Sequence, residues 1–190
     1  MKYYQPGHKI PKEDIHQIIT SASQAPSSWN LQHWKFLIID DQAQKEKLLP
    51  IAYGQKQIVD SSVVIAVLGD TEAYKNAEIA FSNTVDGEFI PKIYNDFVAQ
   101  IEEAYQYPQT ARDEAIRNGS LAGMQLMIAA KALGYDSCPM GGYDTEKFVE
   151  VFNVPARYMP IMLITVGLPV RPARKTTRLP FDKITVSNTF

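Results

Sequence analysis

The sequence predicts one domain built from both helices and strands. The chain has 190 residues, a length that suits a single domain, with 45% hydrophobic and 21% charged residues as in ordinary globular proteins. Runs of β-branched and apolar residues at 62–68 and 160–166 are typical of buried strands. Residues 112–133 form the longest helical pattern. No internal repeat or linker divides the chain, so we expect a single domain over residues 1–190.

The first part of the chain is predicted to alternate between helices and strands. Pro11 suits the first turn of a helix, and apolar residues then recur at helical spacing up to about Ala25. Trp34 begins an apolar run that predicts the first strand. The predicted elements are, in order, helix 11–25, strand 34–39, helix 42–49, a helical turn at 55–59 and strand 62–68.

The second part contains a less regular insertion. Residues 71–107 are polar and rich in Tyr and Phe, with a turn at Asp86-Gly87 and a helix start at Pro91, and we expect a mostly helical excursion over one face of the domain. Glycines in the middle of helix 112–133 disfavour the helix by up to about 1 kcal/mol each, which predicts tight packing against another helix. The remaining predicted elements are strand 136–138, a helix capped by Asp144 or Thr145 and ending near Phe152, and strand 160–166.

The C-terminal segment 168–190 has prolines and basic clusters in place of periodicity. It ends with apolar residues in alternation, Ile184 and Val186. Because such a segment cannot bury itself, we expect an arm that lies across a partner subunit and adds an edge strand there.

Composition and motif absences exclude several functions. The net charge of −2 gives no broad basic field, so nucleic acid is not expected as a partner. No apolar run approaches 18 residues and no signal peptide is readable, so no membrane contact is expected. A single cysteine excludes an intrachain disulfide and fits a cytoplasmic location. The three histidines lack metal-ligand spacing, and neither a Gly-x-Ser-x-Gly nor a Gly-x-Gly-x-x-Gly motif is present.

The stretch from Ala25 to Trp34 carries the most informative pattern. Four uncharged hydrogen-bonding side chains lie within six positions, at Ser27, Ser28, Asn30 and Gln32. Pro26 stops the preceding helix from continuing. The segment can be a simple connector between helix and strand, or it can present hydrogen-bonding groups to a planar heteroaromatic ligand.

This stretch resembles the Ala-Pro-Ser-Ser-x-Asn-x-Gln-x-Trp signature of the flavin-dependent nitroreductase family. Three further regions agree with that family in the same order: Gln55-Lys56-Gln57, Pro139-Met140-Gly141-Gly142-Tyr143 and Arg178-Leu179-Pro180. The resemblance runs from Lys2 to the end of the chain. It implies an α+β fold of three layers (α/β/α) with a mixed, mainly antiparallel sheet, and an intertwined homodimer with FMN at the interface.

The resemblance also implies a role for individual residues. In one subunit Pro26, Ser27, Ser28 and Asn30 would face a flavin that the other subunit holds through Lys2, Gln57, Gly141, Gly142 and Arg178. The Gln57 amide would contact the pyrimidine edge, the glycine backbone would lie near flavin N5, and the Arg178 guanidinium would bind the phosphate. No residue is assigned as a catalytic acid or base. The family's N-terminal Arg-x-Ser-x-Arg/Lys motif is matched only in its last two positions, by Met1-Lys2.

The activity implied is the reduction of nitroaromatics, quinones or similar planar acceptors by NAD(P)H in a ping-pong cycle. A chain without a dinucleotide fingerprint fits this cycle, because the nicotinamide needs only brief contact with a tightly held flavin. Other flavin chemistry on the same fold (flavin fragmentation, dehalogenation or enone reduction) and a non-catalytic flavin-binding protein are the alternatives.

Overall fold

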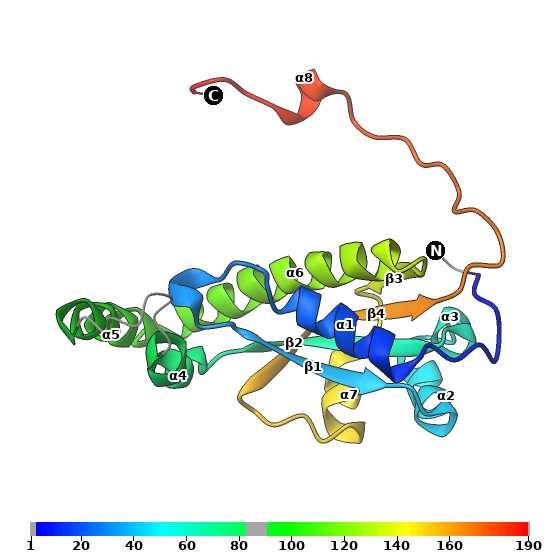
Figure 1. The fold of residues 1–190 in the computed structure, drawn as a ribbon, viewed down its shortest axis with the longest axis horizontal. Coiled ribbons are helices and arrows are strands. Elements are labelled where there is room, and N and C mark those ends of the chain that lie inside the picture. The colour runs from blue at the N-terminus through cyan, green and yellow to red at the C-terminus, as the bar shows by residue number, and fades with distance from the viewer. Residues whose placement is uncertain (1–2, 83–90, 190) are drawn as a thin grey trace.

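A four-stranded sheet forms the centre of the molecule (Figure 1). In this computed structural model, which describes residues 3–82 and 91–189, the strand order is β1-β2-β4-β3, and all three pairings are antiparallel. The strands are β1 (Trp34–Ile39), β2 (Val63–Asp70), β3 (Asp136–Met140) and β4 (Tyr158–Gly167). We expect a mixed, mainly antiparallel sheet. Within the described residues all strand pairings are antiparallel, and no parallel pair is present.

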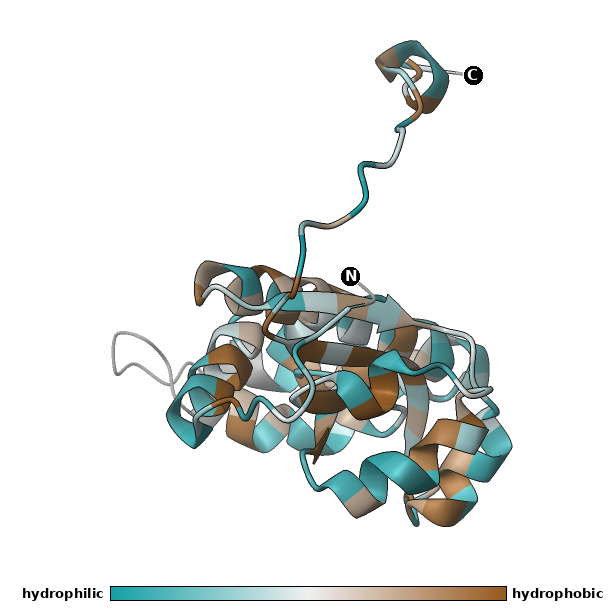
Figure 2. Cartoon of the chain, turned by 90° about the vertical axis from the view of Figure 1, so that its right-hand side faces the viewer, coloured by the Kyte–Doolittle hydropathy of each residue, from teal (hydrophilic) through white to brown (hydrophobic). Residues whose placement is uncertain are grey.

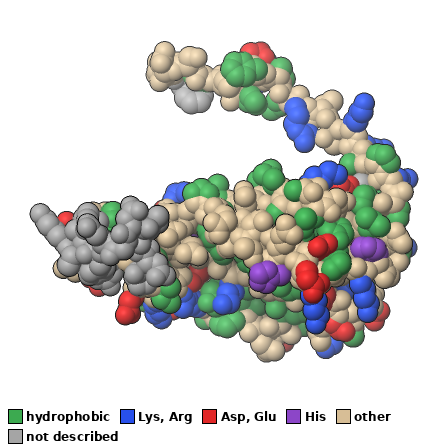
Figure 3. All heavy atoms as spheres, viewed as in Figure 1, with side chains coloured by type: hydrophobic (Ala, Val, Ile, Leu, Met, Phe, Trp, Pro, Cys, Tyr) green, Lys and Arg blue, Asp and Glu red, His purple; other side chains and the backbone are tan. Residues whose placement is uncertain are grey.

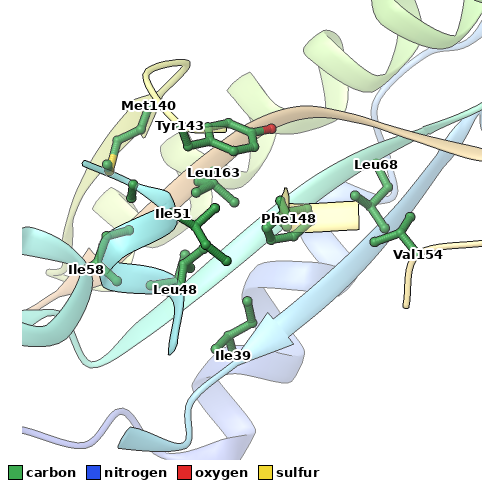
Figure 4. Close-up of a cluster of buried hydrophobic side chains, with 13 residues drawn as sticks. Ile39, Leu48, Ile51, Ile58, Leu68, Met140, Tyr143, Phe148, Val154 and Leu163 are labelled. Carbon is green, nitrogen blue, oxygen red and sulfur yellow. The ribbon is translucent and has the colours of Figure 1, made fainter. Parts of the chain in front are cut away.

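Strand β2 separates two hydrophobic cores because all eight of its residues are buried. Val63, Ile65 and Val67 face α1 (Lys12–Ala22) and α6 (Pro108–Ala132), where Ile18 and Leu126 are fully buried. The residues between them face α2 (Gln42–Ile51), α3 (Gln57–Asp60) and α7 (Thr145–Val151), around a fully buried Phe148 (Figure 4). This alternation along one strand produces the expected three layers.

The helix boundaries follow local chemistry. The α1 helix ends at Ala22, three residues before the predicted end, and α6 begins at Pro108, four residues before the predicted start. Of the two cap candidates for α7, Asp144 is the cap, since its carboxylate accepts from the Lys147 amide at 3.0 Å. None of the helices in the described ranges is long and apolar enough to cross a membrane.

The glycines of α6 correct one prediction, because they pack against the sheet and not against another helix. A Cβ at Gly119 would lie 2.2 Å from Cδ1 of Ile161, and one at Gly123 would lie 3.3 Å from Sδ of Met162. Both contacts are with β4 side chains. A side chain at either position would require these β4 side chains to move, so the two glycines allow α6 to pack closely against the strand.

The insertion 71–107 folds into short helices at one end of the sheet (Figure 1). They are the 3₁₀ turn η2 (Ala73–Asn76), α4 (Ala77–Ser82) and α5 (Pro91–Tyr105). The predicted turn at Asp86-Gly87 lies outside the described residues. Leu31, from the loop before β1, joins Ala73, Ala77 and Ile101 in a small buried cluster, so this insertion is packed directly against the Ala25–Trp34 stretch.

After β4 the chain leaves the body as an extended arm (Figure 2). Residues 171–189 are exposed throughout, including Leu179, Phe181, Ile184 and Val186. Within the described residues the arm forms one helical turn, α8 (Phe181–Ile184), and the edge strand expected at Ile184 and Val186 on a partner subunit stays a prediction. Within this turn the Lys183 N–H donates to the Pro180 carbonyl at 3.0 Å.

Candidate functional site

The loop from Ser27 to Gln32 is the most strained segment of the described backbone. It contains the 3₁₀ turn η1 (Ser28–Asn30), and Trp29, Asn30 and Gln32 have φ angles of 50°, 53° and 53°. Non-glycine residues in this region cost on the order of 1 kcal/mol or more each and persist only where the surroundings fix them. Here the Ser27 hydroxyl accepts from the Gln32 amide at 2.9 Å.

The long helix α6 holds the centre of this loop through Ser28. The Ser28 amide donates to Oδ1 of Asn118 at 3.0 Å, and its hydroxyl donates to Oε2 of Glu114 at 2.5 Å. The Asn118 side-chain amide donates to the same Oε2 at 2.8 Å, and Arg117 donates to the other carboxylate oxygen. Burial alone would raise the pKa of Glu114, but the hydrogen bonds from Ser28, Asn118 and Arg117 and the charge of Arg117 lower it, so Glu114 is a carboxylate.

A second polar group lies where α3 meets the turn after β3. The Gln55 side-chain amide donates to the Gly142 carbonyl at 2.8 Å, and Gln57 donates to Oε1 of Gln55 at 3.0 Å. Gln57 is only 6% exposed, whereas Gly141 and Gly142 are exposed. No atom lies within 4 Å of a Cβ built at Gly141. A flat ring can therefore approach this backbone closely.

The cationic residues lie on the arm. Arg171, Arg174, Lys175 and Arg178 are all exposed, and Figure 3 shows basic side chains along the arm before α8. The Arg171 guanidinium stacks 3.6 Å from the centre of the Tyr3 ring. Arg178 donates to the Thr176 hydroxyl at 2.6 Å and to the Thr177 carbonyl at 3.0 Å. The predicted phosphate ligand Lys2 lies outside the described residues.

One chain does not bring these groups together. The Ser27–Gln32 loop leads into β1, at one edge of the sheet, whereas Gly141-Gly142 follows β3, at the opposite edge. Three inter-strand steps of ~4.8 Å separate the two edge strands by roughly 14 Å. The arm, which carries Arg178 shortly before α8, extends away from the body that holds both (Figure 1).

Three residues that contact the predicted site residues are absent from the predicted set: Gln55, Glu114 and Asn118. Glu114 and Asn118 read as polar positions of a helix, and only their four-residue spacing places them on one face. Gln55 belongs to the Gln55-Lys56-Gln57 region that matches the family. The contact with the pyrimidine edge of the flavin is predicted for Gln57, which is the more buried of the two glutamines. The sequence pattern around the start of α3 is too weak to decide which of the two glutamines, Gln55 or Gln57, is exposed.

The chemistry of these donors fits FMN, the expected cofactor. Uncharged hydroxyls and amides suit a neutral heterocycle, the open glycine backbone leaves room for its plane, and guanidinium groups suit a phosphate dianion. Within one chain these groups are distributed over two edges of the sheet and the arm.

Comparison with known proteins gives one consistent result. The sequence profile of the nitroreductase family matches residues 2–168. YodC of Bacillus subtilis (strain 168), which carries the provisional name of an NAD(P)H nitroreductase, is 46% identical over 185 residues, covering 97% of this chain and 92% of YodC. A provisional nitroreductase of Exiguobacterium sibiricum 255-15, solved in complex with FMN, is 36% identical with a TM-score of 0.89, covering 98% and 91% of the two chains. The CLA biosynthesis enone reductase of Lactiplantibacillus plantarum is 28% identical, covering 94% and 85%.

Proposed function

This chain belongs to the nitroreductase family, and on that premise we propose that it reduces nitroaromatics, quinones or similar planar acceptors with NAD(P)H in a ping-pong cycle. It is an oxidoreductase, and its cofactor is FMN. The observation that carries the proposal is the separation of the loop donors and the open glycine turn onto opposite edges of one sheet. Such a division is what a cofactor site shared between two subunits requires.

We propose a homodimer that joins the two half-sites. The outer face of α6 presents Leu121, Met124 and Ile128, which are 43%, 53% and 52% exposed, at the spacing of one helical stripe. Figure 3 shows hydrophobic side chains reaching the surface on the side where α6 lies. An apolar stripe of this kind together with an apolar-tipped arm supports burial against a second copy.

The arm of each subunit would pair with an edge strand of the other. Two edges are available, and β3 contains Pro139, which has no amide hydrogen to donate. Strand β1 has no proline. Residues at its C-terminal end line a cavity of about 330 Å³, together with Phe152. These features favour β1 as the acceptor for the partner's arm.

The residues of the site bind and orient, and none is assigned as an acid or base. The chemistry that FMN supplies when bound is two-electron transfer from a nicotinamide to an acceptor. Backbone groups of Gly141 and Gly142 would lie against the ring of the cofactor, and the hydroxyls of Ser27 and Ser28, with Pro26 and Asn30 beside them, would face it from the other subunit. Arg178 would hold the phosphate, and the Gln55–Gln57 pair would contact the pyrimidine edge.

A second acceptor class is enone reduction, which the named enone reductase of L. plantarum favours at 28% identity. The uncharged Ser27 hydroxyl accepts from the Gln32 amide, and its own proton can be donated to a carbonyl as well as to a nitro group. Steady-state rates with a quinone, a nitroaromatic and an α,β-unsaturated ketone, each at fixed NAD(P)H, separate the two classes.

A visible absorption spectrum tests the proposal as a whole. The purified protein should show bound flavin, which should bleach on anaerobic addition of NADH or NADPH and return on addition of a quinone. A yellow protein that neither nicotinamide bleaches would contradict the reductase and support a flavin-binding protein. A protein that takes up no FMN at all would overturn the cofactor site.

A further inference from the structure

The side chain of Ser28 has a fixed hydrogen-bond polarity. Its hydroxyl proton lies on the 2.5 Å contact with Oε2 of Glu114, and an ionised carboxylate can only accept. Its amide hydrogen is taken by Oδ1 of Asn118 at 3.0 Å. Both donors of Ser28 therefore point toward α6, and what the hydroxyl can offer to a ligand is its remaining lone pair.

The carboxylate is itself held in place, so this polarity is built into the helix. Glu114 is 9% exposed and Asn118 is 1% exposed. Asn118 donates to the Glu114 carboxylate at 2.8 Å and to its backbone carbonyl at 2.7 Å, while Arg117 covers the second carboxylate oxygen. The Glu114 carboxylate thus accepts from Ser28, and Asn118 and Arg117 donate to the same carboxylate and hold it in place.

We propose that Ser28 Oγ is an acceptor-only contact that recognises an N–H donor of the bound ligand, and that Glu114 is the positioning residue that sets this preference. The inference rests on the proposed function, in which this loop faces the cofactor and its reductant. Two groups there carry such a donor: the carboxamide of a nicotinamide and the imide N–H of the flavin ring. Nitro and quinone oxygens carry none, so this contact favours the reductant or the cofactor over the acceptor.

The experiment compares matched ligands that differ in the N–H group. In the first arm, nicotinamide and 3-acetylpyridine are titrated into the FMN-loaded protein, with fluorescence of Trp29 and Trp34, the two tryptophans of the chain, as the signal. In the second arm, FMN and 3-methyl-FMN are titrated into protein freed of flavin. Each arm yields a ratio of two dissociation constants, which does not depend on the fraction of protein that is unfolded.

Three variants test the assignment. Ser28→Ala removes the acceptor, Glu114→Ala frees the Ser28 proton, and Glu114→Gln keeps an acceptor oxygen at the same place. We expect the wild-type protein to favour the N–H ligand by about fivefold to tenfold in at least one arm, as the loss of one hydrogen bond implies. Ser28→Ala should bring that ratio close to one. Glu114→Ala should lower the ratio, because the freed hydroxyl can rotate and is no longer held as an acceptor, and Glu114→Gln should restore it.

The arm that responds identifies the ligand group, nicotinamide or flavin. A wild-type ratio near one in both arms would overturn the proposal, as would a Glu114→Ala variant that keeps the full preference. If the flavin does not bleach with NAD(P)H while the second-arm ratio behaves as expected, the proposed reductase fails and the Ser28 contact to flavin stands.

Discussion

Arg157 binds Asp70 through two parallel hydrogen bonds, Nε to Oδ1 at 2.7 Å and Nη2 to Oδ2 at 2.6 Å. Asp70, at the end of β2, is 2% exposed. The same Nη2 donates to Oδ1 of Asn76 at 3.1 Å, and Asn76 donates to the Leu31 carbonyl at 2.9 Å. One guanidinium therefore connects the sheet, the insertion 71–107 and the loop that precedes β1.

Arg157→Ala should destabilise the protein by about 3–5 kcal/mol, because it leaves the buried Asp70 carboxylate without its partner. Urea unfolding followed by circular dichroism measures the loss. Lys131→Ala is the matched control: Lys131 pairs with Asp136 at 2.7 Å, but its side chain is 70% exposed, so less than about 1 kcal/mol should be lost. Equal losses in the two variants would contradict the structural role of the Arg157 pair.

Stability should fall between pH 6.5 and pH 4 because of His33. This side chain is fully buried, its ring stacks on Tyr105, and burial lowers its pKa to about 4, against weaker opposing effects of Glu114 and Asp70. In this range the unfolded chain binds the proton and the folded chain does not, so acid favours unfolding. The loss amounts to roughly 3 kcal/mol at the lower end.

His33→Phe keeps a ring against Tyr105 and removes the titration. The difference in unfolding free energy between this variant and the wild type should therefore change in favour of the variant as the pH falls through that range. If this difference in unfolding free energy stays constant from pH 7 to pH 4, the pKa of His33 is the same in the folded and the unfolded protein, and the prediction is wrong.

The proposed homodimer should dissociate when charge is placed on the outer face of α6. Met124 and Ile128 are both more than half exposed, so lysines there meet no obstacle in the isolated chain but would be buried against a second copy. Light scattering should give twice 21.4 kDa for the wild type and 21.4 kDa for a Met124→Lys, Ile128→Lys variant. A folded wild-type monomer at micromolar concentration would contradict the dimer.

Arg178→Ala should weaken FMN binding by roughly tenfold to a hundredfold, through the loss of about 1.5–3 kcal/mol of charge-assisted hydrogen bonding to the phosphate. Riboflavin, which lacks the phosphate, should bind the variant and the wild type equally. Lys183→Ala, which removes a basic side chain from α8 on the same arm, is the control. An unchanged FMN affinity in Arg178→Ala would move the phosphate contact to another cation.

The pattern of apolar residues was sufficient to predict the strands and helices of the body. Strand β1 begins and ends at the predicted residues, because polar turns on both sides limit the run of β-branched and aromatic residues. The partner of the α6 glycines could not be predicted, because a glycine indicates a close approach without naming the neighbour.

The sequence was sufficient to predict the residues of the loop but not the residues of α6 that hold the loop in place. Ser27, Ser28 and Asn30 belong to one short motif, whereas Glu114 and Asn118 reach Ser28 from about ninety residues further along the chain. Contacts across such a separation depend on the angle at which α6 crosses the sheet, and no local pattern encodes that angle. The same distance in sequence explains why the polarity of the Ser28 hydroxyl became visible only in three dimensions.

In the proposed homodimer, the placement of the loop and the glycine turn on opposite edges of the sheet would make cofactor uptake a cooperative process. When each binding place is completed only by association, FMN and the second subunit are thermodynamically linked: each lowers the free energy of binding of the other. Dilution of the protein should then release flavin even at constant excess of free FMN, and added FMN should shift the monomer–dimer equilibrium toward the dimer. In a cell, the yield of active enzyme would thus rise more steeply than in proportion to the amount of chain synthesised.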